Sequence, residues 1–263
     1  MNITQTLGIA IGIIGFLMLI TFHEAGHFAV AKLLGINVVE FSVGMGPLLT
    51  QKEKNGTLYS FRLLPIGGYC ALEGEDGIDE EGNLIPSDDP KAFVNAPAWK
   101  RLLVLLAGSF VNLVVGFFIF VIVYSVVAAG KVGFGRILEV SVLECRDMFV
   151  EIFRFLGGLF NGSSSVDDVS GIVGIVAAVA DTASYGIINV IYLIGLLSVN
   201  LSIMNMLPIP GLDGGRIFIM FIKWICRGKL SQKAENIING VGLVFLLVLM
   251  GLLIIKDTSS LIH

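Results

Sequence analysis

The stretch ITFHEAGHFAVAKLLG, residues 20–35, puts two histidines and a glutamate inside an otherwise apolar segment. On an α-helix His23 and His27 lie on one face, about 6 Å apart. Their imidazoles can then bind one Zn²⁺, and Glu24 can reach a water molecule at the metal. Because ionisable residues within a membrane segment are costly, they are functional candidates. The pattern therefore predicts a hydrolytic zinc site.

A catalytic zinc ion usually has three protein ligands, so two histidines leave one to find. No other histidine follows His27 closely, which favours a carboxylate on a later segment. Asp213 stands in NMLPIPGLDGGRIF, where prolines and glycines interrupt the helix between two apolar runs. Irregular backbone at membrane depth is tolerated only where it lines a protein cavity. We expect Asp213 to bind the metal, a role compatible with capping a helix that begins near Gly214.

Two other acids compete less well for the metal. Asp181, between Ala180 and Thr182, is expected to cap the helix that follows it. Glu40 is adequately explained by solvation at the edge of a strand.

Composition indicates a membrane protein, since 55% of the 263 residues are hydrophobic and only 14% are charged. About 20 helical residues cross a bilayer. We predict a mainly α, polytopic protein with one domain over residues 1–263 and spans at about 8–34, 101–128, 186–207 and 235–255. The apolar segment 171–180 is too short to span and is expected to be re-entrant or interfacial.

The 17 lysines and arginines predict the orientation of the spans. Most of them fall in the loops 35–100 and 208–234 or at the span ends beside these loops. Because cytoplasmic loops carry the excess of positive charge, both termini are predicted to be extracytoplasmic. The histidines then lie toward the cytoplasmic end of the first span, at a depth similar to that of Asp213.

The loops have distinct predicted structures. Alternating β-branched and aromatic residues, with a turn at Asn55-Gly56, predict a membrane-associated β-hairpin or sheet over 36–75 on the cytoplasmic side. Residues 76–97 are predicted to form an acidic, solvated loop. The extracytoplasmic loop 129–185 has an apolar stripe from Met148 to Phe160, typical of an amphipathic helix. That helix lies in the membrane interface or packs on the bundle. The three cysteines, widely spaced, favour neither a disulfide framework nor a metal site.

HEAGH on one span together with NMLPIPGLDGG on a later one resembles the site-2 protease family of intramembrane zinc metalloproteases. Within that family the chain is most similar to the bacterial regulator-of-sigma protease subgroup. The stretches FSVGMGP, LLPIGGYCALEGED, KRLLVLLAGSFVNLVVG and SVDDVSGIVGI resemble that subgroup in order and spacing. The resemblance covers most of the chain.

The resemblance implies a role for each matching residue. His23, His27 and Asp213 would ligate zinc, and Glu24 would be the general base. Asn205 would hold the substrate backbone, although a helix that simply ends before Pro208 explains it equally well. Asn112 matches a second asparagine with a similar suggested role.

The same resemblance implies a substrate class and a location. The protein would be a zinc-dependent intramembrane endopeptidase of the bacterial cytoplasmic membrane, acting in regulated intramembrane proteolysis. Its partners would be the lipid bilayer and single-pass transmembrane substrates such as anti-sigma factors or signal-peptide remnants. We expect no nucleic-acid partner.

The sequence departs from the family pattern in three places. Ser109 and Ile172 stand where proline is expected, away from the metal motifs. The residues between Ala128 and Glu151 are too few for a PDZ domain, which the subgroup usually carries there. This absence puts substrate gating in doubt and leaves the chemistry unaffected.

Other functions explain the motifs less well. A membrane metal transporter would favour more ionisable residues along its spans, and Glu24 would have no role in it. A catalytically silent scaffold could lose Glu24 freely. A membrane-anchored protease that cuts soluble peptides remains open, because the predicted site lies at the membrane edge.

Overall fold

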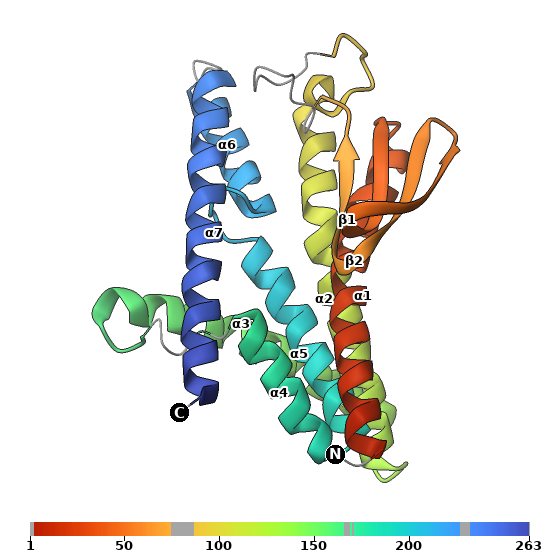
Figure 1. Ribbon diagram of the computed structural model, residues 1–263, viewed down its shortest axis with the longest axis vertical. Helices are drawn as coiled ribbons and strands as arrows, with labels where there is room; N and C mark the ends of the chain where they lie inside the picture. The colour runs from red at the N-terminus through yellow and green to blue at the C-terminus, as the bar shows by residue number, and fades with distance from the viewer. Residues whose placement is uncertain (1–2, 75–86, 166–168, 170, 227–231, 263) are drawn as a thin grey trace. The chain divides into compact units, whose positions relative to one another are not determined.

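The computed structural model describes residues 3–74, 87–165, 169, 171–226 and 232–262. Its elements are labelled in Figure 1. They are α1 (Ile3–Leu33), β1 (Val38–Lys54), β2 (Thr57–Leu72), the short 3₁₀ helix η1 (Phe93–Asn95), α2 (Ala98–Ala128), α3 (Phe134–Asn161), α4 (Ile172–Ser184), α5 (Ile187–Asn205), α6 (Asp213–Ile225) and α7 (Gln232–Ile262).

The predicted fold class is confirmed: the described chain is mainly helical with one small antiparallel sheet. Within it, four helical stretches are long and apolar enough to cross a membrane. They are Thr6–Leu33, Ala98–Ala128, Ile187–Asn205 and Gly240–Ser259, close to the predicted spans. Part of the predicted acidic loop and part of SVDDVSGIVGI lie outside the described residues.

The chain divides into two compact units. One comprises residues 17–112, with the sheet, the second half of α1 and the first half of α2. The other comprises residues 1–16 and 113–263, with the remaining parts of those two helices and α3 to α7.

In the unit of residues 17–112, β1 and β2 form a long, bent hairpin (Figure 1, orange). The predicted turn is present, and Asn55 and Gly56 have φ of 52° and 69°, as a type I′ turn requires. The strands bend near Gly44, so that residues 40–43 of β1 pair on one side with residues 68–71 at the end of β2 and on the other with residues 58–61 at its start. Gly44 has φ of 84°, and an added Cβ would lie 2.7 Å from the carbonyl oxygen of Leu64. The bend therefore requires glycine.

Glu40 lies within this sheet, and its predicted solvation at a strand edge is wrong. It is half-buried and accepts a 2.9 Å hydrogen bond from Arg62 Nη2. Arg62 Nη1 also donates to the carbonyl of Gly46 at 3.0 Å, and the guanidinium lies 5.5 Å from the centre of the Tyr69 ring. The ion pair thus fastens the bend of β1 to β2. A single carboxylate in an apolar stretch of sequence does not reveal a cross-strand partner 22 residues away.

In the other unit, α4 is a short apolar helix that begins where a re-entrant segment was expected. Its N-terminus is capped from far along the chain: Asp257 Oδ2 in α7 accepts hydrogen bonds from the N–H groups of Gly171 at 2.9 Å and Gly174 at 2.8 Å. Asp181 lies inside α4, and the N-cap residue of α5 is Gly186, without a side-chain cap. The predicted capping by Asp181 is therefore wrong.

α3 confirms the predicted amphipathic helix and extends it toward the N-terminus. It runs across the direction of α7 rather than alongside it in the view of Figure 1. Its outer face exposes Val142, Phe149, Val150 and Phe153, while Met148 and Ile152 pack inward. A location in the membrane interface remains a prediction.

The Glu40–Arg62 pair predicts a pH-dependent contribution to stability. Burial alone would raise the pKa of Glu40, but its hydrogen-bonding neighbours Ser60, Arg62 and Tyr69 together lower it below the usual 4.5. A group with a depressed folded-state pKa stabilises above its unfolded pKa and loses that contribution as the pH falls through the folded value. We expect Glu40→Gln to lower the unfolding free energy by about 1 kcal/mol or less at pH 7, because the pair is partly exposed. Thermal unfolding in detergent between pH 7 and pH 3 measures the difference in stability between the wild type and Glu40→Gln. This difference should become smaller only below about pH 4.5. A constant difference across that range would contradict the assignment.

Candidate metal centre

α1 carries His23 and His27 on one buried face, and their side chains converge. The residues are 6% and 8% exposed, and their Nε2 atoms lie 3.2 Å apart. Zinc–imidazole bonds are about 2.0–2.1 Å, so two nitrogens on one tetrahedral ion are separated by about 3.3 Å. The pair therefore has the spacing that a shared metal ion demands.

The second ring nitrogen of His27 fixes the orientation of its imidazole. His27 Nδ1 lies 2.7 Å from the carbonyl oxygen of Val104 in α2, and a carbonyl can only accept. Nδ1 therefore carries the proton and donates it to Val104. The lone pair is left on Nε2, the atom that faces His23.

Glycines allow α1 and α2 to approach closely and leave space for the two histidine rings. An added Cβ at Gly108 would lie 2.4 Å from His27 Nε2 and 2.8 Å from His23 Cε1. An added Cβ at Gly26, inside HEAGH, would lie 2.6 Å from the carbonyl oxygen of Ala107. Sequence reasoning passed over these contacts. The signal available was the small-residue run Ala107-Gly108-Ser109, since small residues let membrane helices approach closely.

Asn112 follows Gly108 by one turn of α2 and contacts the other histidine. It is fully buried, and its amide group lies 3.5 Å from His23 Nδ1. The structure thus brings Asn112 together with the histidines. Its predicted contact with substrate remains a prediction.

Glu24 is half-buried and directly follows His23 on α1. Its place on α1 follows from the helix itself, which continues unbroken from Ile3 to Leu33. The general-base role remains a prediction.

Asp213 is the first residue of α6, and Leu212 is the N-cap. The helix therefore begins one residue earlier than predicted, and Asp213 is its first residue rather than its cap. A carboxylate in the first turn is favoured by the unsatisfied N–H groups and the positive end of the helix dipole.

A tightly packed loop holds the start of α6. Added Cβ atoms at Gly214 and Gly215 would lie 2.3 Å and 2.1 Å from the carbonyl oxygens of Met206 and Ile209. On the other side, an added Cβ at Gly242 of α7 would lie 2.3 Å from Cβ of Pro210. The glycines that follow Asp213 therefore let the loop backbone cross the helix end, and α7 supports the loop from behind.

Asn205 is the last residue of α5, and Met206 follows as the C-cap. The explanation of Asn205 as a helix-ending residue is therefore confirmed. Its proposed contact with substrate remains a prediction.

The chemistry of the donors fits a zinc ion. Among the described residues, His23, His27 and Asp213 make up the set of side chains suited to hold a metal. Two imidazoles and one carboxylate are a donor set of catalytic zinc sites, in which a fourth position stays open.

Comparison with known proteins identifies the family of this chain. The profile of peptidase family M50 matches residues 11–249. The chain belongs to peptidase family M50. It is accordingly a membrane zinc metalloprotease of the site-2 type.

Individual members of the family are similar over most of their length. A predicted zinc metalloprotease of Clostridium acetobutylicum is 28% identical, over 95% of this chain and 96% of its own. Zinc metalloprotease RasP of Shouchella clausii is 26% identical, over 94% and 97%, and the chloroplastic membrane metalloprotease ARASP of Arabidopsis thaliana 26%, over 92% and 77%. The first alignment spans 335 positions against 263 residues in this M50 chain, so that relative has residues without a counterpart here.

Gly108 provides a test of the metal centre. Gly108→Ala places a methyl group against both imidazoles, so we expect zinc content to fall by at least tenfold and cleavage with it. Metal analysis of the purified protein measures the loss. The control is Gly251→Ala in α7, where an added Cβ meets nothing within 4 Å. Full zinc content in Gly108→Ala would contradict the geometry described here.

Proposed function

We propose that this M50 protease hydrolyses peptide bonds within the transmembrane segments of single-pass membrane proteins. The observation that carries the proposal is the buried, converging His23–His27 pair inside an apolar helix. Ligands carried within a spanning helix favour a substrate that itself lies in the membrane over a soluble peptide.

The residues divide the chemistry between them. Zinc, when bound, supplies a Lewis acid that polarises the scissile carbonyl and stabilises the negative charge developing on its oxygen. Glu24 takes a proton from the attacking water as the oxygen–carbon bond forms. Glu24 then returns that proton to the amine nitrogen as the carbon–nitrogen bond breaks, so that the carboxylate is restored.

Asp213 is proposed as the third protein ligand. Two features support this role: the position in the first turn of α6, which favours a carboxylate, and the glycines that hold the loop around it. Asp213 would then set the charge of the centre. Two neutral imidazoles and one carboxylate leave a net positive site for a developing oxyanion.

The two asparagines are assigned different tasks. Asn112 places its amide nitrogen Nδ2 3.5 Å from His23 Nδ1, as His27 is held by Val104, and so orients the ring. Asn205 lies where α5 ends, and its amide can both donate to and accept from an extended peptide backbone. A substrate helix must unwind to expose its carbonyls, and such a partner would replace its lost hydrogen bonds.

Substrates and location follow from the family resemblance and the charge distribution. We propose anti-sigma factors or signal-peptide remnants as substrates, cut in regulated intramembrane proteolysis in a bacterial cytoplasmic membrane. Both termini would be extracytoplasmic and the centre would lie toward the cytoplasm. The surplus residues of longer relatives, and the direct passage from α2 to α3, support a member without a PDZ domain.

Glu24→Gln tests the general base. The amide has nearly the same shape but cannot take a proton, so we expect cleavage of a single-pass transmembrane reporter to fall at least 100-fold. Zinc content should stay at the wild-type level, because Glu24 is not a ligand. Cleavage by the variant at the wild-type rate would refute the assignment.

Asp213→Ala is expected to lose zinc, whereas Glu24→Gln is expected to retain it. Removing a ligand weakens metal binding, so we expect both zinc content and reporter cleavage to be lost. Asp181→Ala, which removes an acid on α4, is the matched control and should retain both. If Asp213→Ala holds zinc as tightly as wild type, the third ligand lies elsewhere.

A further inference from the structure

α2 and α5 are in close contact in the unit of residues 1–16 and 113–263. An added Cβ at Gly116 would lie 2.5 Å from Val199 Cγ2, and one at Gly195 would lie 2.8 Å from the Phe120 ring. Such small-residue contacts let two membrane helices approach closely. A directional hydrogen bond adds a further restraint on the rotation of one helix against the other.

Glu144 of α3 makes that directional contact to both helices at once. Its Oε2 accepts a 2.8 Å hydrogen bond from the hydroxyl of Tyr124, near the end of α2. Its Oε1 accepts a hydrogen bond from the hydroxyl of Tyr192, near the start of α5. Each carboxyl oxygen thus holds one spanning helix.

The surrounding contacts hold α3 in place for this task. Phe120 and Val199 are fully buried, and with Ile203 they form a core against which α3 packs. Cys145, beside Glu144, is half-buried against this core. Ile203 lies two residues before Asn205, so the core reaches from the Glu144 contact toward the substrate-binding end of α5.

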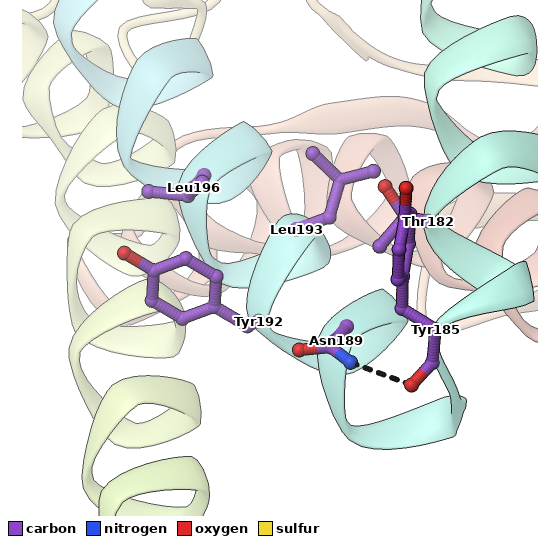
Figure 2. A pocket seen from close by; sticks show the side chains of 6 residues that line it. All are labelled: Thr182, Tyr185, Asn189, Tyr192, Leu193 and Leu196. Atoms are coloured by element: carbon purple, nitrogen blue, oxygen red, sulfur yellow. Dashed lines mark hydrogen bonds between the residues drawn. The ribbon is translucent and has the colours of Figure 1, made fainter.

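The tyrosine on α5 has a second environment. A cavity of about 380 Å³ opens between α4 and α5, and Tyr192, Leu193 and Leu196 form part of its lining (Figure 2). The Tyr192 ring stands at one side of the cavity, with its hydroxyl directed away from Thr182 and Tyr185. Space beside the ring means that packing on the α4 side leaves α5 room to turn. The hydroxyl bond to Glu144 is what opposes that turn.

We propose that Glu144 is a positioning residue that fixes α5 against α2 and thereby places Asn205 for substrate binding. The inference rests on the proposed substrate contact of Asn205. Tyr192 and Asn205 lie on one continuous helix, about 20 Å apart along its axis. A rotation of α5 at the Tyr192 end therefore also displaces Asn205.

The test separates binding from chemistry. Glu144→Ala should raise KM for a transmembrane reporter about tenfold, in proportion to two lost hydrogen bonds. The kcat should change less than threefold, and zinc content should not change. Glu144→Gln, which retains one acceptor oxygen, should restore part of the affinity, and the double variant Tyr124→Phe/Tyr192→Phe should match Glu144→Ala.

The native thiol beside the contact supplies a readout that needs no activity. With Cys70 and Cys226 replaced by serine, maleimide alkylation of Cys145 reports how firmly α3 is held. Glu144→Ala should accelerate alkylation several-fold. Glu139→Ala is the control: it removes the same charge from the same helix at an exposed position paired with Arg136, and should alter neither KM nor alkylation.

Each outcome decides the proposal. An unchanged KM with unchanged alkylation in Glu144→Ala overturns it, as does loss of zinc and kcat together, which would mark a general folding requirement. If Glu144→Ala does not fold, Glu144→Gln and the tyrosine variants carry the same comparison. If the wild type cleaves no transmembrane reporter, the proposed function fails, while alkylation still tests the contact of α3.

Discussion

The metal centre depends on one steric constraint, the contact of α1 with α2 at Gly26 and Gly108. Imidazoles in an apolar helix are expensive to bury unless each nitrogen has a partner. The close approach places the Val104 carbonyl against one ring and Asn112 against the other. Because Gly26 and Gly108 have no side chains, the two helices can approach closely, and space remains for the imidazole rings. The packing of α1 against α2 therefore also determines the positions of the two histidine rings.

The sequence was sufficient to predict features that depend on the spacing of residues close together in the chain. Four-residue spacing on a helix dictates that His23 and His27 share a face, and uninterrupted apolar runs dictate the spans. Asn55-Gly56 likewise encodes its own turn, because both residues tolerate positive φ. In each case the information lies within a few residues of the feature that it determines.

Errors arose where the deciding partner is distant in sequence. Glu40 owes its environment to Arg62 across a bent sheet, and the cap of α4 comes from Asp257, 86 residues from Gly171. Gly108 shows the same limit at the site itself. A glycine in an apolar helix signals a close neighbour, but only the fold reveals that the neighbour is a pair of metal-binding rings.

The contact of Gly242 with Pro210 has a consequence for the order in which the protein becomes an enzyme. The loop that presents Asp213 is backed by α7, which follows it in the sequence. During synthesis from the N-terminus, HEAGH is complete long before that support exists. A nascent chain that has not yet reached α7 therefore carries the histidines while the loop before Asp213 lacks this support.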